Sequence, residues 1–225
     1  MKMPMKTWKK VVLIILALLV VALIGLYLWQ GENIRALLKV LTTDSETIQQ
    51  ELVQVQDDHR KELEESAQIT IHVPSVSTQQ SEDLLNGKVT AGEVKEQMGY
   101  VSEETVPTVS GKEDILNQCI AELYAYKADV MGYLGGLKQE AVSEWNALEK
   151  SQRTAAKKAE IAKRGIGKCY DYEVQVDGRV QEILAVYRQK MLDIGEDPTP
   201  IDLLWNQYCE EKAAEKSYYF DTYLN

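Results

Sequence analysis

The sequence predicts an all-α protein with a single N-terminal transmembrane helix, a helical stalk and a distal up-down-up three-helix bundle. Three observations support this prediction. A run of 19 residues near the N-terminus carries no charge. Apolar residues recur at alternating spacings of three and four over most of the remaining chain. Short polar connections join the last three of these periodic segments, as in antiparallel bundles.

The uncharged run at residues 11–29 is long enough for a membrane-spanning helix. At the helical rise it covers about 28 Å, close to the ~30 Å apolar core of a bilayer. Lysines precede it and aromatic residues stand at both ends, so interface anchors are predicted at Trp8, Lys9, Lys10, Tyr27 and Trp29. The lysines place residues 1–10 in the cytoplasm and the bulk of the chain outside it, a single-pass plasma-membrane location.

Two alternatives to this topology stay open. A cleaved signal peptide has an apolar run of about 7–15 residues followed by small residues, and neither feature fits here. The reverse orientation stays open because the charge difference across the run is moderate.

The predicted stalk, residues 30–66, carries a heptad-like seam. The seam is Ile34, Leu38, Leu41, Ser45, Ile48, Leu52, Val55 and His59. It predicts either a short parallel coiled coil or an amphipathic helix that packs on the protein's own distal domain. A capping pattern starts a new helix at Asp44. His59 is either a pH-sensitive position or an edge residue turned toward water.

Residues 67–112 predict a flexible spacer with one small helical hairpin at 81–98. Residues 69–73 alternate like a short strand and end at Pro74, and extended chain is the alternative. Within the hairpin, Asn86 and Gly87 form the turn, and Thr90 with Glu93 forms a capping box.

The distal domain, residues 113–225, predicts three helices at about 113–148, 153–194 and 200–224. Gly195 ends the second helix, and Thr199 followed by Pro200 starts the third. In the second helix, the predicted seam toward the first runs through Ala155, Ala159, Ala162 and Ile166. The first helix contains Gly132, Gly135 and Gly136, which predict either a bend or close approach of the second helix.

The three cysteines leave two possibilities. Register along the bundle brings Cys119 and Cys209 to similar levels, so a disulfide between them is possible outside the cytoplasm. The alternative is three buried thiols, which is where unpaired cysteines usually lie.

Basic residues gather around the predicted first turn of the bundle. Residues 150–168 hold seven Lys and Arg against Glu160 alone. They predict a docking surface at Lys157, Lys158, Lys163 and Arg164 for an acidic surface, either the protein's own stalk or an anionic envelope polymer or lipid. A solvated charged face is the alternative.

Composition excludes several function classes. The formal net charge of -10 disfavours nucleic-acid binding. Two histidines and three scattered cysteines do not form a zinc module. The sequence has no phosphate-binding loop and no nucleophile or metalloprotease motif. We therefore expect no enzyme activity, and no catalytic, cofactor-binding or metal-binding residues.

These patterns predict a membrane-anchored, non-enzymatic interaction or scaffold protein of the cell envelope. Its expected partners are membrane lipid and either another protein or a second copy bound through the stalk. The alternative is an extracytoplasmic binding module for an anionic or carbohydrate component. That module would use the basic 150–168 hairpin or the C-terminal aromatic cluster at Tyr218, Tyr219, Phe220 and Tyr223.

Overall fold

The computed structural model describes residues 39, 42–100 and 111–224, without the side chains of Phe220, Tyr223 and Leu224. The chain divides into two compact units. Unit 1 is Met1–Arg60 with Gln207–Asn225, and unit 2 is Lys61–Asn206. Two helices, α2 (Ser45–Ala67) and α7 (Thr199–Leu224), contribute to both units.

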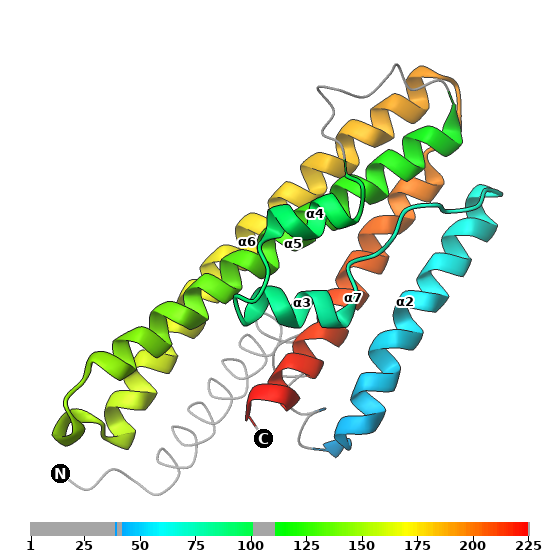
Figure 1. The fold of residues 1–225 in the computed structure, drawn as a ribbon. Helices are drawn as coiled ribbons and strands as arrows, with labels where there is room; N and C mark the ends of the chain where they lie inside the picture. The colour runs from blue at the N-terminus through cyan, green and yellow to red at the C-terminus, as the bar shows by residue number, and fades with distance from the viewer. Residues whose placement is uncertain (1–38, 40–41, 101–110, 225) are drawn as a thin grey trace, which may run out of the picture. The chain divides into compact units, whose positions relative to one another are not determined.

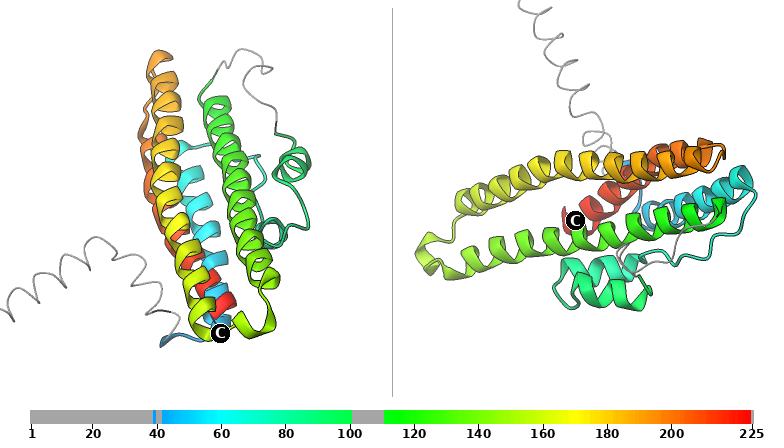
Figure 2. Two further views of the ribbon diagram at one scale, coloured as in Figure 1. Left: turned by 90° about the vertical axis from the view of Figure 1, so that its left-hand side faces the viewer. Right: turned by 90° about the horizontal axis from the view of Figure 1, so that it is seen from above.

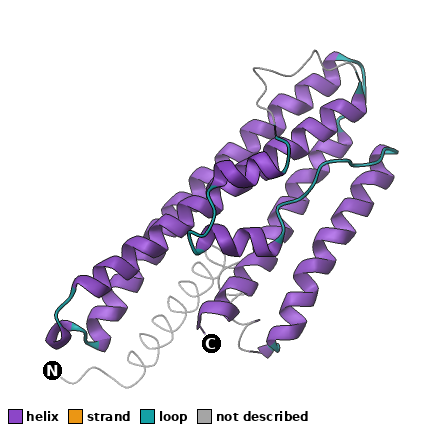
Figure 3. Ribbon diagram, viewed as in Figure 1, coloured by secondary structure: helices purple, strands orange, loops and turns teal. Residues whose placement is uncertain are grey.

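The predicted all-α class is confirmed for the described residues, which contain helices and no strand (Figure 3). Besides α2 and α7, the α-helices are α3 (Thr78–Leu85), α4 (Ala91–Gln97), α5 (Lys112–Ala147) and α6 (Ala155–Asp193), with a 3-10 turn, η2, at Lys150–Gln152. The ends of α5, α6 and α7 lie within two residues of the predicted ones. Residues 69–73 form neither helix nor strand.

In unit 2, α5 and α6 form a long antiparallel hairpin and lie side by side (Figure 1). Figure 2 shows the same pairing from two further directions. The turn is closed by Arg153, which donates to the carbonyl oxygens of Leu148 at 3.0 Å and Asn146 at 2.8 Å. Thr154 then caps α6 by accepting from the Lys157 amide. These contacts satisfy backbone groups that the two helix ends leave without intrahelical partners.

Burial is concentrated away from the turn of the hairpin. The buried side chains of α5 and α6 include Ile115, Leu116, Ile120, Met131, Val176, Val180, Ile183 and Tyr187. Between residues 136 and 175, Ile161 is the one buried residue. We call this stretch, residues 136–175, the hairpin end.

The small hairpin predicted at 81–98 packs on α5, as α3 and α4 (Figure 1). Ser77 caps α3, and the predicted capping box at Thr90 is confirmed at the start of α4. Leu84, Leu85 and Val94 are buried. The helical hairpin that the sequence predicted within the spacer is therefore packed on α5 as part of unit 2.

Two glycines of α5 admit this small hairpin. A Cβ on Gly135 would overlap the carbonyl oxygen of Leu84, and a Cβ on Gly132 would lie 3.6 Å from that of Ala91. The prediction that these glycines bring the second long helix close is therefore wrong for Gly132 and Gly135. They face α3 and α4.

The described part of unit 1 is built on α2 and α7. Asp44 caps α2 as predicted, accepting from the Thr47 amide at 2.9 Å. Further along, Ile48 and Leu52 of α2 form a core cluster with Ala214 and Tyr218 of α7. The side of α2 that the coiled-coil prediction assigned to a partner is therefore occupied, at these positions, by α7 of the same chain.

The predicted three-helix bundle is not confirmed. Close helix pairing in unit 2 joins α6, α3 and α4 to α5. By contrast, α7 starts in unit 2 and passes into unit 1, where Ala214 and Tyr218 pack on α2. In a simple three-helix bundle, α7 would pack against α5 and α6 along its whole length. Here its C-terminal part packs against α2 instead.

The membrane prediction is corrected. Its helix at residues 11–29 and its anchors Trp8, Lys9, Lys10, Tyr27 and Trp29 lie outside the described residues. Among the residues that are described, no helix combines the length and the apolar character that crossing a bilayer requires. The longest, α5 and α6, have charged side chains along their lengths. Single-pass plasma-membrane localisation therefore has no support from the structure.

The neighbouring glycines of α5 give a matched stability test. Gly135→Ala should lower the free energy of unfolding by about 1–3 kcal/mol, because its methyl group would overlap the backbone of α3. Gly136→Ala should raise it by up to about 1 kcal/mol, because its methyl group meets nothing within 4 Å and alanine favours helix. Urea unfolding measures both. Equal effects of the two substitutions would contradict the close packing of α3 on α5.

Candidate interaction surface

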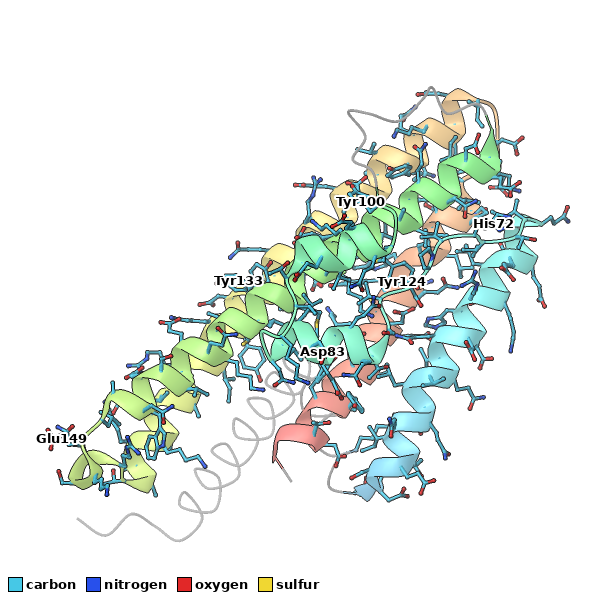
Figure 4. The ribbon with its side chains drawn as sticks, viewed as in Figure 1. His72, Asp83, Tyr100, Tyr124, Tyr133 and Glu149 are labelled. Atoms are coloured by element: carbon cyan, nitrogen blue, oxygen red, sulfur yellow. The ribbon has the colours of Figure 1, made fainter. Side chains whose placement is uncertain are left out.

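The hairpin end presents the basic residues that the sequence predicted as a docking surface. Figure 4 shows Glu149 at the turn of the hairpin and Tyr133 further along α5. All seven basic side chains of residues 150–168 are at least partly exposed: Lys150, Arg153, Lys157, Lys158, Lys163, Arg164 and Lys168. Some of these cations have partners within the described residues, and others have none there.

One row of α6 pairs with α5. We call Lys157, Ile161, Arg164 and Lys168 the α5-facing row; their spacing of four, three and four puts them on one helix face. Arg164 pairs with Glu144, and Lys168 holds both carboxylate oxygens of Glu140 at 2.7 and 2.8 Å. The ammonium of Lys168 lowers the pKa of Glu140, and that of Lys157 lowers the pKa of Glu160. The pairs that Arg164 and Lys168 form with α5 fix the register of the hairpin end, although each contributes little to stability, whereas Lys157 and Glu160 pair within α6.

A second row of α6 faces away. The exposed row, Ala155, Ala159, Ala162 and Ile166, is exposed at every position, and Ile166 retains 50% of its accessible surface. Each of its members precedes a member of the α5-facing row by two residues, a rotation of about 200° around the helix. The predicted seam through these alanines is therefore wrong, because the opposite face packs on α5.

Two of the four predicted docking residues flank the exposed row. Lys158 is spaced three and four residues from Ala155 and Ala162, and Lys163 likewise from Ile166 and Ala159. Both lysines are exposed, and neither forms an ion pair within residues 42–100 and 111–224. The other two predicted residues, Lys157 and Arg164, belong to the α5-facing row. Sequence reasoning grouped all four because it did not place the acids of α5 opposite them.

His59 is a polar site that sequence reasoning underestimated. It is 8% exposed and lies between two carboxylates of α7. Its Nε2 is 3.0 Å from Glu210 and its Nδ1 is 3.6 Å from Glu211. Its backbone carbonyl accepts from the buried amide of Gln207 at 3.0 Å. The nearby carboxylate of Glu211 raises the pKa of His59, opposed by burial and assisted by the carboxylate of Glu210. The adjacent acids Glu210 and Glu211 are visible in the sequence, but no pattern in the sequence near them indicates that they pair with a residue of α2.

The remaining predicted site residues are the cysteines and the C-terminal aromatic residues. Cys119 is buried, Cys169 and Cys209 are partly exposed, and burial raises the pKa of the Cys119 thiol. The Cys119–Cys209 disulfide stays a prediction. Tyr218 is buried. The ring of Tyr219 lies edge-to-face with it and packs on the core that α2 and α7 share. The side chains of Phe220 and Tyr223 are not described.

Comparisons with known proteins add no family or relative. No protein-family model matches the chain, and no curated protein or solved structure matches it. The geometry of the described residues is therefore the basis for any functional assignment.

The His59 site predicts a pH dependence of stability. Because its folded pKa is raised, His59 contributes stability that is complete below its unfolded pKa and is lost as pH rises through the folded pKa. The free energy of unfolding of the wild type relative to His59→Gln should therefore fall as pH rises above the ordinary histidine pKa of about 6.5 and through the raised folded pKa. Urea unfolding at a series of pH values measures it.

The control is His72→Gln, because the side chain of His72 is 70% exposed. This control should keep the pH dependence of the wild type. A His59→Gln variant whose stability changes with pH in parallel with the wild type would contradict the role of the two carboxylates.

Proposed function

We propose that this chain is a non-enzymatic helical interaction protein that docks an acidic protein partner on the outward face of α6 at the hairpin end. The observation that carries the proposal is the exposed row with Lys158 and Lys163 on its two flanks. Because both lysines lack ion pairs within the described chain, their charges are available to carboxylates of a partner.

The apolar part of this face supports a helical partner. Helix axes pack 8–10 Å apart, roughly according to the size of the side chains at the contact, and alanines allow a close approach. Ile166 adds a larger apolar side chain at one end of the row. Burying half-exposed apolar surface of this kind on binding is favourable at about 25 cal/mol per Å².

Charge favours an acidic partner over a second copy. Two copies docked through this face would bring four like charges to the rim of one interface, and like charges oppose association. A carboxylate on each flank of a partner helix would instead pair with Lys158 and Lys163. The absence of nucleotide-binding and nucleophile motifs from the sequence supports a binding role over a catalytic one.

Retention of the full chain on immobilised poly-L-glutamate tests this function. A protein of net charge -10 should be retained only through a local basic surface, and added salt should release it. Lys158→Gln with Lys163→Gln should weaken binding about threefold to tenfold, the worth of two exposed ion pairs. The matched control, Lys88→Gln with Lys112→Gln, changes the net charge equally and should bind like the wild type.

Each result decides one part of the proposal. Absence of retention at low salt, or equal binding by the two double variants, would overturn the acidic-partner proposal. Stronger retention on dextran sulfate than on poly-L-glutamate would replace the acidic protein by an anionic polysaccharide. Sedimentation of the wild type as a dimer that the Lys158 and Lys163 substitutions tighten would indicate self-association through this face.

A further inference from the structure

A groove of about 550 Å³ lies along the α5–α6 hairpin, on the side of α6 away from the exposed row. From α5 it is lined by Tyr133, Gly136, Leu137 and Glu140, and from α6 by Lys168, Asp171, Tyr172 and Gln175. Its volume is in the range of small-molecule and side-chain binding sites, about 300–1,000 Å³. All of its lining residues belong to unit 2.

Two tyrosines form the aromatic wall of the groove. The rings of Tyr133 and Tyr172 are 4.0 Å apart between centroids and tilted by 35°. Tyr133 remains 45% exposed, and Figure 4 shows it on α5. Burial raises the pKa of Tyr172 to about 12, so its ring is neutral at physiological pH. Neutral aromatic rings present a negative face, which attracts cations.

The floor beside Tyr133 is open. Gly136 is exposed, and a Cβ added there would meet nothing within 4 Å. A group the size of a methyl therefore fits at this turn of α5. A planar or slender group can lie against the backbone at Gly136 and the ring of Tyr133 together.

The charged side chains of the groove also favour a cationic ligand. Lys168 is held by both oxygens of Glu140, so these two charges largely neutralise each other. Asp171 is exposed, and its carboxylate has no ion pair within the described residues. The unpaired charge of the groove is therefore negative. An anionic ligand would meet Asp171 and the negative ring faces, whereas a cation would be attracted by both.

We propose that this groove binds an organic cation, a guanidinium or alkylammonium group, which lies on the ring of Tyr133 and pairs with Asp171. An arginine side chain of a partner peptide and a free polyamine share this chemistry. On α6 the groove residues begin at Lys168, and Asp171 is eight residues from Lys163, about 80° around the helix and about 12 Å along its axis. The site therefore does not overlap the proposed acidic docking surface.

The test is a titration of the full chain, labelled on its tyrosine rings and followed by NMR. The probes are the peptide acetyl-Gly-Arg-Gly-Arg-Gly-amide, spermidine and the matching glutamate peptide. The signal absent from Tyr133→Phe identifies Tyr133. We expect the two cationic probes to shift the Tyr133 and Tyr172 signals and the glutamate peptide to leave them unchanged.

Four variants separate the cation site from general attraction to an acidic chain. Tyr133→Leu and Asp171→Asn should each raise the dissociation constant about twofold to fivefold, as expected for an exposed cation–π contact or ion pair. Tyr133→Phe keeps the ring, and Asp193→Asn removes an exposed acid elsewhere on α6; both should bind like the wild type. Circular dichroism checks that each variant is folded.

Two results would overturn the proposal: cationic probes that leave both tyrosine signals unchanged, or Asp193→Asn weakening binding as much as Asp171→Asn. Tighter binding of the arginine peptide than of spermidine supports an arginine of a partner protein, and the reverse supports a polyamine. Loss of poly-L-glutamate retention in Lys158→Gln with Lys163→Gln, with unchanged cation binding, would show that the two surfaces act separately.

Discussion

The close approach of α3 to α5 at Gly135 is the constraint on which unit 2 depends. A side chain there would collide with the backbone at Leu84, so one face of α5 is committed to the small hairpin and another to α6. The small hairpin covers α5 beside residues that are already buried, and its turn reaches the start of the hairpin end, where Lys138 donates to the side-chain oxygen of Asn86 at 2.7 Å and Gln139 lies beside Gly87. Further along the hairpin end, α5 has α6 as its close neighbour, and Ile161 is the one buried residue between 136 and 175. Two helices alone cannot enclose a wide apolar core, so polar contacts must set the register there.

Those polar contacts explain why one face of α6 is left exposed. Glu140 and Glu144 of α5 pair with Lys168 and Arg164, and these pairs turn the α5-facing row inward. The aliphatic stems of lysine and arginine cover apolar surface while their charged ends reach the glutamates. Ile161, the large apolar residue of this face, is then buried, and the alanines on the opposite face remain in water. A stretch with so few buried apolar contacts has low local stability, so a bound partner would order it as well as cover it.

Local signals in the sequence predicted the helices well, because caps and periodicity act within a few residues. Thr90, Asp44 and Gly195 mark helix ends in the sequence and in the structure. The choice between two rows of α6 with the same spacing was not predictable in this way. It depends on glutamates that lie 20 and 28 residues away in the chain. The same limit applies to His59, whose carboxylate partners lie on α7, and to Gly135, whose neighbour is α3. Sequence analysis found Lys158 and Lys163 but could not separate them from the paired Lys157 and Arg164.

Positive and negative side chains occupy different positions on α6, so the net charge of the chain does not predict which ligand a given part of this helix attracts. Lys163 and Asp171 are eight residues apart, about 12 Å along the helix axis. Exposed charges are largely screened beyond about 8 Å at physiological salt. A ligand near Asp171 is therefore affected mainly by the groove, and a ligand near Lys163 mainly by the exposed row. These two charges, both without an ion pair in the described residues, are also about 80° apart around the helix, so one helix can attract carboxylates at one position and a cation at the other. A partner that carries both signs in the matching arrangement would bind more specifically than either charge alone allows, because the mismatched orientation would bring like charges together.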